Sequence, residues 1–174
     1  MQKNWYILYT KPGREKKTAA LLTKRKIANF YALNRRETGS ARGRKIAYVP
    51  LFTSYVFVKT IATELDKLKQ IGHVLSLVYW KGQPAIVSED EINSVKKFSD
   101  NHFHIKLIRS KVFENKMVTI NNPSYLIEGN VLSVKNKVMK VNLPSLGFTM
   151  LAEIDNDRVI GREVGFGEKD LVLQ

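Results

Sequence analysis

The stretch "VPLFTSYVFVK" (residues 49–59) decides the fold, because aromatic and β-branched residues alternate in it after a proline. Successive side chains of a strand point to opposite faces, so Tyr55 and Phe57 share one face while Val56 and Val58 share the other. Both faces are therefore apolar. This pattern fits a central strand that is covered on both sides. It also fits a strand whose aromatic face is only partly covered and receives a partner.

The composition indicates a globular protein of one medium domain or two small ones. The chain has 174 residues, of which 44% are hydrophobic and 26% charged. No apolar stretch approaches the roughly 20 residues that a membrane-spanning helix needs. The absence of cysteine excludes disulfides and thiolate metal sites. We therefore expect a cytoplasmic protein without a membrane segment.

The charge is strongly basic and unevenly distributed. There are 29 Lys and Arg residues against 16 Asp and Glu, which gives a net charge of +13 and a pI near 9.9. Residues 1–48 hold 13 of the basic residues but only two acidic ones, Glu15 and Glu37, and so carry +11 of the total. Such a field attracts a polyanion. Nucleic acid fits better than an acidic membrane, because no strongly amphipathic basic helix is visible; a merely solubilising basic surface is the alternative.

Strand and helix patterns alternate along the first hundred residues. Aromatic and β-branched runs predict strands, and helix formers with apolar residues at helical spacing predict helices. Ser88 with Glu91 forms a capping-box signature at the start of the last helix. The expected elements are strands at 5–10, 28–37, 45–59 (interrupted near Pro50) and 73–80, a Gly/Ser/Arg loop at 38–44, and helices at 14–26, 63–71 and from 89. This order predicts an α+β fold with helices flanking a small, mainly antiparallel sheet.

The pattern changes after residue 105. From Val112 onward, short β-branched runs are separated by turn residues at regular intervals, which is typical of a small β-barrel. We therefore predict an N-terminal domain over residues 1–105, a linker over 106–111 and a barrel over 112–174.

An enzyme is not indicated. His73, His102 and His104 are the three histidines, and no third ligand accompanies the last two. Exposed imidazoles in a linker are the simpler interpretation. The sequence also lacks a phosphate-binding glycine loop, a dinucleotide fingerprint and a nucleophile elbow. We predict a binding protein with no catalytic residue, no metal site and no cofactor.

Two groups of residues could bind partners. Lys and Arg side chains neutralise phosphates, although each alone is more often a solvated surface charge. Aromatic side chains give a large contact area at low entropic cost, although core packing explains them equally well. The basic group is Lys11, Arg14, Lys16, Lys17, Lys24, Arg25, Arg35, Arg36, Arg42, Arg44 and Lys45, and the aromatic group is Trp5, Tyr6, Tyr9, Phe52, Tyr55 and Phe57.

Three stretches carry a resemblance to a known family: "WYILYTKPGREKK", "PLFTSYVFV" and "GHVLSLVYWKGQPAIVSEDEI". In order and spacing they resemble the N-terminal (NGN) domain of the NusG family of transcription elongation factors, over nearly all of the first hundred residues. The segment from Phe113 to Asp155 resembles a diverged KOW domain, the SH3-like barrel that follows in this family, with Gly129 at the expected glycine. The chain is most similar to the specialised paralogues, RfaH and the UpxY-like antiterminators of polysaccharide operons.

The resemblance implies a mechanism. The NGN domain of the family docks on the clamp helices of RNA polymerase and suppresses pausing, and specialised members also read the non-template DNA strand. The KOW domain recruits a ribosomal protein or Rho, or contacts nucleic acid such as nascent RNA. By resemblance, this chain is expected to be a monomeric antitermination factor.

The resemblance also implies site residues. Tyr9, Phe52 and Tyr55 match polymerase-facing aromatics of the family, and Phe57 joins them. The turn and helix near Lys11 lie where RfaH-like proteins approach DNA. The nucleic-acid-binding residues expected here are Lys11, Arg14, Lys16, Lys17, Lys24, Arg25, Arg42 and Arg44.

The sequence departs from the family pattern at several points. Thr53 and Ser54 replace the usual Pro-Gly or Pro-Asn, and Gln70 with Ile71 stands where RfaH has a DNA-contacting Thr-Arg pair. The segment "NPSY" (residues 122–125) stands where a KOW domain has Gly-Pro-Phe. A general NusG factor and a free-standing KOW-type RNA-binding protein are therefore the alternative functions. The target operon, the recognised nucleic-acid element and the partner of the second domain are not specified by the sequence.

Overall fold

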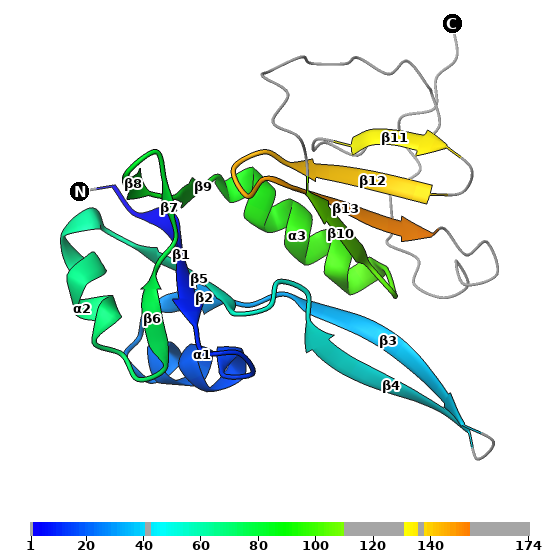
Figure 1. Cartoon of the computed structure of the whole chain (residues 1–174), viewed down its shortest axis with the longest axis horizontal. Helices are drawn as coiled ribbons and strands as arrows, with labels where there is room; N and C mark the ends of the chain where they lie inside the picture. The colour runs from blue at the N-terminus through cyan, green and yellow to red at the C-terminus, as the bar shows by residue number, and fades with distance from the viewer. Residues whose placement is uncertain (1, 41–42, 110–130, 136–137, 154–174) are drawn as a thin grey trace, which may run out of the picture.

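The computed structural model describes residues 2–40, 43–109, 131–135 and 138–153 (Figure 1). Its α-helices are α1 (Glu15–Lys24), α2 (Leu65–Lys69) and α3 (Glu89–Asn101), with a 3-10 turn (Ala62–Glu64) before α2. Its strands are β1 (Asn4–Thr10), β2 (Ala28–Phe30), β3 (Leu33–Ser40), β4 (Gly43–Pro50), β5 (Tyr55–Thr60), β6 (Val74–Leu77), β7 (Tyr79–Trp80), β8 (Gln83–Pro84), β9 (Ile86–Val87), β10 (Lys106–Arg109), β11 (Val131–Lys135), β12 (Val138–Leu143) and β13 (Phe148–Glu153). None of the helices in these described residues has the length and apolar character that crossing a membrane requires.

The N-terminal sheet is antiparallel and is centred on β1 and β5. Its strand order is β2-β5-β1-β6, and β9 also pairs with β1. The register of β1 on β5 runs from Asn4 opposite Thr60 to Tyr9 opposite Tyr55. The mixed α and β elements and the mainly antiparallel N-terminal sheet that the sequence predicted are therefore present.

The two faces of β1 and β5 belong to different cores, as the alternation in the sequence predicted. Phe57 packs in one cluster with Trp5, and Tyr55 lies against that cluster. Val56 packs in the other cluster with Tyr6, beside buried residues of α1 and α2. The predicted aromatic group is therefore divided: Tyr6 faces α1 and α2, away from the other aromatic side chains.

A two-stranded ribbon, β3 with β4, replaces the predicted loop at residues 38–44. The strands continue to Ser40 and resume at Gly43, and Gly39 pairs with Arg44. The loop prediction was wrong because the Gly, Ser and Arg composition of a turn says nothing about how far the strand pairing extends toward it. Figure 1 shows this ribbon reaching away from the rest of the molecule.

Three further elements differ from their predicted extent. The strand expected over 73–80 is divided into β6 and β7. The single strand expected over 28–37 is divided, because its first part pairs with β5 and its second part with β4. Helix α1 ends at Lys24 rather than continuing to residue 26, since Lys26 adopts a positive φ of 59° that ends the helix.

Helix α3 begins with the predicted capping box. Ser88 Oγ accepts a hydrogen bond from the Glu91 backbone N–H (3.2 Å), and Glu91 Oε2 accepts from the Ser88 N–H (3.3 Å). Each contact satisfies a backbone donor that the first helical turn leaves unpaired. The two residues therefore fix where α3 starts.

The second sheet, called the C-terminal sheet below, has the strand order β10-β13-β12-β11. Residues 106–109, which the sequence assigned to a linker, form β10, with Leu107 opposite Met150. The linker prediction missed this strand because the pairing partner lies far along the chain. Gly129 and the segment 122–125 lie outside the described residues, so the KOW-like barrel and the predicted division into domains remain predictions.

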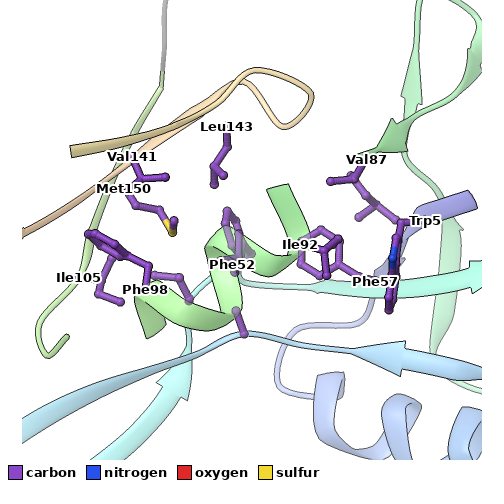
Figure 2. Packing of buried hydrophobic residues seen from close by; sticks show 14 of the residues in the cluster. Trp5, Phe52, Phe57, Val87, Ile92, Phe98, Ile105, Val141, Leu143 and Met150 are labelled. Carbon is purple, nitrogen blue, oxygen red and sulfur yellow. The ribbon is translucent and has the colours of Figure 1, made fainter. Parts of the chain in front are cut away.

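The C-terminal sheet shares a core with α3 and with the aromatic face of β1 and β5. Val141, Leu143 and Met150 are buried in the same cluster as Phe52 and Phe98. Figure 2 shows Phe52 facing the side chains that the C-terminal sheet contributes. The two sheets are therefore held together by an apolar contact.

A buried asparagine connects the ribbon to the segment that follows α3. Asn34, at the base of β3, donates from Nδ2 to the Ile105 carbonyl (2.7 Å) and accepts at Oδ1 from the Ile105 N–H (2.9 Å). Both bonds are buried, so they satisfy backbone groups that water does not reach.

We predict that Asn34→Ala lowers the free energy of unfolding by about 2–4 kcal/mol, because two buried backbone groups of Ile105 lose their partner. Urea denaturation at an unchanged m-value measures this loss. Asn101→Ala is the matched control, since Asn101 is exposed and its loss should change stability by less than about 0.5 kcal/mol. Equal stability of the two variants would contradict the assigned role of Asn34.

Candidate partner-binding surfaces

The predicted polymerase-facing aromatic residues lie together on one face of the N-terminal sheet. Tyr9 on β1 is opposite Tyr55 on β5, with ring centroids 6.2 Å apart and nearly perpendicular rings. Phe52, in the turn before β5, stacks on Tyr55 at 6.4 Å and meets Phe57 edge-on at 5.7 Å. We call these four residues the aromatic face.

A buried carboxylate shapes the turn that carries Phe52. Ser54 has a φ of 67°, a conformation that costs energy for a residue other than glycine. Its N–H donates to Glu15 Oε1 (2.7 Å), and its carbonyl accepts from the Thr10 N–H (2.8 Å). Glu15 is only 2% exposed. The turn therefore forms with a buried carboxylate in support rather than a proline and a glycine, and no residue near Ser54 in the sequence points to Glu15.

Only part of the aromatic face reaches the surface. Tyr9 is 39% exposed and Tyr55 is partly exposed, but Phe52 is 4% exposed and Phe57 is fully buried. Phe57 also stacks on Phe30 of β2, with centroids 5.9 Å apart. The two tyrosines are therefore the members of the face that a partner can touch in this arrangement.

The C-terminal sheet covers Phe52. The Phe148 ring at the start of β13 lies edge-on to the Phe52 ring, with centroids 6.0 Å apart (Figure 2 shows the surroundings of Phe52). The turn between β12 and β13 is also attached to α3, because the Ser145 N–H donates to Glu91 Oε1 (2.8 Å). Glu91 therefore uses one oxygen to cap its own helix and the other to hold the C-terminal sheet.

Polar side chains border the aromatic face near Trp5. The Trp5 Nε1–H and the Lys59 ammonium both donate to Glu89 Oε2, at 2.8 and 2.6 Å. The pKa of Glu89 is lowered below its usual value, mainly by the hydrogen bond from Lys59 and to a lesser extent by the hydrogen bond from Trp5. Lys96 on α3 lies 5.3 Å from the ring centroids of both Trp5 and Phe30, within cation–π range. This border is therefore positively charged.

The predicted basic residues gather on α1 and at its two ends. The residues Lys11, Arg14, Lys16, Lys17, Lys24 and Arg25 are all exposed. Thr18, Ala19 and Leu22 form the buried side of α1, so the basic side chains share its solvent side. The Lys11 N–H donates to the His73 carbonyl (2.9 Å), which ties this basic surface to the start of β6. We call these six residues the α1 basic surface.

Two other predicted nucleic-acid-binding residues are not part of this surface. Arg44 is exposed on β4, in the ribbon that reaches away from α1 (Figure 1). Arg42 lies outside the described residues. Of the remaining basic residues, Arg35 stacks on Phe103 at 4.3 Å and donates to the Asp100 carbonyl, so it holds the ribbon on the end of α3.

The histidines near residue 103 have structural roles. The prediction of an exposed imidazole was wrong for His102, whose ring stacks on Phe98 at 4.3 Å and whose pKa is lowered mainly by burial. His104 is exposed, but its Nε2 accepts from the Glu37 N–H (3.2 Å) and its own N–H donates to the Arg35 carbonyl (2.8 Å). Within the described ranges, no cluster of three or more His, Cys, Asp or Glu residues could hold a metal ion.

The N-terminal part of the chain is an antiparallel sheet flanked by helices, with an aromatic face on one side and a basic surface on α1. Residues 3–96 match the family model described as "Transcription termination factor nusG", and the chain therefore belongs to the NusG family. NusG-family proteins are transcription elongation and termination factors that bind RNA polymerase and are not enzymes.

A solved structure titled "Domain interaction in Thermotoga maritima NusG" is similar to the chain with a TM-score of 0.43 and 17% sequence identity. The similarity covers 89% of this chain and 99% of that one. A search of curated proteins found no matching relative.

We predict that Glu91→Ala accelerates hydrogen exchange at the Ser145 amide by about 10- to 150-fold. The amide loses a hydrogen bond to a carboxylate, which contributes about 1.5–3 kcal/mol against local opening. Amide exchange followed by NMR or mass spectrometry measures the change. Asp90→Ala is the matched control, because Asp90 is exposed in the same helical turn. An unchanged rate at Ser145 in the Glu91 variant would contradict the attachment of the C-terminal sheet to α3.

Proposed function

We propose that the chain is a specialised NusG-family factor that binds the clamp helices of RNA polymerase and suppresses pausing or termination at particular operons. The observation that carries the proposal is that the family match covers residues 3–96, the part of the chain that forms the aromatic face and the α1 basic surface. The proposed polymerase-binding residues are Tyr9, Phe52, Tyr55 and Phe57.

The chemistry of the aromatic face supports this assignment. A protein that receives a pair of helices needs an apolar surface with large, rigid side chains. Tyrosines supply such contact area at low entropic cost. Tyr9 and Tyr55 present such a surface at the end of the β1–β5 pair, and Phe52 extends it toward the C-terminal sheet. The positively charged border near Lys96 limits the apolar patch on one side.

The contact between Phe52 and Phe148 requires a further step. While β13 lies on Phe52, the clamp helices cannot reach that side chain. We propose that the C-terminal sheet leaves the aromatic face when polymerase binds. Because the contact buries apolar side chains of both sheets, the clamp helices would have to cover the aromatic face in place of the C-terminal sheet. The released sheet would then be free to recruit a ribosomal protein or Rho.

The α1 basic surface is proposed to contact nucleic acid, either the non-template DNA strand or nascent RNA. Six exposed Lys and Arg side chains on α1 and at its two ends support this role, because they neutralise phosphates without needing a particular sequence. The concentration of positive charge in residues 1–48 favours a specialised factor over a general one. On this proposal the protein acts as a monomer in the cytoplasm.

We predict that Tyr9→Ala/Tyr55→Ala weakens binding of the full chain to purified core RNA polymerase by about 30-fold or more, the effect of losing hot-spot side chains. Biolayer interferometry measures the affinity, after thermal unfolding has shown that the variant is folded. Phe52 is less suitable for this test, since removal of a buried Phe side chain costs about 3–5 kcal/mol and weakens the fold itself.

Tyr79→Ala is the matched control for this experiment. Tyr79 on β7 is 49% exposed, similar to Tyr9, but it is not part of the aromatic face. Its loss should leave polymerase binding unchanged. A folded double variant that binds polymerase like the wild type would contradict the site, and would favour the alternative of a free-standing RNA-binding protein.

A further inference from the structure

The β3–β4 ribbon presents two chemically different faces. Residues that pair across antiparallel strands share a face, and successive pairs alternate between faces. One face carries the pairs Arg35 with Tyr48, Glu37 with Ile46, and Gly39 with Arg44. We call it the Tyr48 face, because its largest exposed side chain is that tyrosine.

The Tyr48 face exposes large apolar side chains beside a positive charge. Tyr48 is 61% exposed and Ile46 is 50% exposed. Arg44 is exposed next along the same face. A single exposed apolar side chain needs no explanation, but a row of two with an arginine on a protruding ribbon suggests a surface that receives a ligand.

A hollow lies at the base of this row. It has a volume of about 190 Å³ and is lined by Phe30, Tyr31, Leu33, Arg35, Tyr48, Ser99 and Asp100. This volume is below the roughly 300–1,000 Å³ of sites that enclose a drug-sized ligand, so it suits one planar group rather than an extended molecule. Tyr48 forms one wall, where its ring can stack against that group.

The positive charge at the hollow is held in place. The Arg35 guanidinium lies over the Phe103 ring, with 4.3 Å from Cζ to the ring centroid, and it donates to the Asp100 carbonyl. Its Nε is buried and has no hydrogen-bond partner among the described residues. The hollow therefore combines an aromatic wall with a fixed cation and the exposed Asp100, so the positive charge that attracts an anion comes from the ribbon as a whole rather than from the hollow alone.

We propose that the Tyr48 face binds single-stranded nucleic acid, with one base stacked on Tyr48 at the hollow and a neighbouring phosphate on Arg44. The described ribbon residues are basic overall, with Arg35, Arg36, Arg44 and Lys45 against Glu37, which favours a polyanion. A single strand fits better than a duplex. Duplex grooves display base edges, whereas an aromatic platform needs the ring face of an unstacked base. This site deepens the proposed nucleic-acid contact of the chain, on which it rests, and adds a second surface to it.

The test measures binding of the full chain to a fluorescein-labelled single-stranded DNA of about 12 nucleotides, a length within the site sizes of single-strand binders. Fluorescence anisotropy gives the affinity at several salt concentrations. Tyr48→Ala should weaken binding by about 5- to 150-fold at each salt concentration and leave the salt slope unchanged, because stacking releases no counterions. Tyr48→Trp should restore the affinity, and Tyr79→Ala, which removes an exposed tyrosine on β7, should have no effect.

The outcomes separate the ribbon site from the α1 basic surface. Normal binding by Tyr48→Ala, together with weaker binding and a smaller salt slope in Arg14→Gln/Lys17→Gln, would overturn the ribbon site and leave the proposed function standing. Equal binding of the same strand when annealed to its complement would overturn base stacking on Tyr48. No binding by the wild-type chain would overturn both nucleic-acid surfaces, the ribbon site and the α1 basic surface, while the proposed polymerase binding is tested separately. Since Tyr48 is largely exposed, its variants should fold, and thermal unfolding checks this.

Discussion

The antiparallel pairing of β1 with β5 is the constraint on which the rest of the structure depends. It places Trp5 and Phe57 on one face and Tyr6 and Val56 on the other, so each strand contributes to two cores at once. Helices α1 and α2 cover one face, which leaves α1 at the surface with its basic side chains outward. The other face is completed by α3 and by the C-terminal sheet. The basic surface and the aromatic face therefore follow from one strand pair.

The sequence predicted features that depend on neighbouring residues. The alternation after Pro50 predicted which side chains share a face, and Ser88 with Glu91 predicted the start of α3, because both patterns act within a few residues. The sequence did not predict the length of the β3–β4 ribbon or the strand at 106–109, since strand pairing depends on partners elsewhere in the chain. The Ser145 contact of Glu91 was also missed, because a capping box already accounted for that carboxylate.

The sequence predicted which residues form the candidate site, but not which of them are buried and which are exposed. The four aromatic residues lie together, and six basic residues lie on α1 and at its two ends. The burial of Phe52 beneath Phe148 had no sequence signal, because an apolar ring looks the same whether a partner or the chain itself covers it. The exposed Tyr48 was missed for a related reason, since alternation places a side chain on a face but does not say whether that face is covered. The binding roles of all these residues remain proposals.

We propose that one apolar face has two alternative occupants, the C-terminal sheet in the free protein and the clamp helices in the polymerase complex. The Ser145 amide reports this directly, since its hydrogen bond to Glu91 exists only while the sheet is in place. The decisive measurement is hydrogen exchange by mass spectrometry on the peptide containing Ser145, with and without saturating core RNA polymerase. Exchange at Ser145 should be faster in the complex. Unchanged protection of Ser145 while polymerase is bound would contradict the release of the C-terminal sheet.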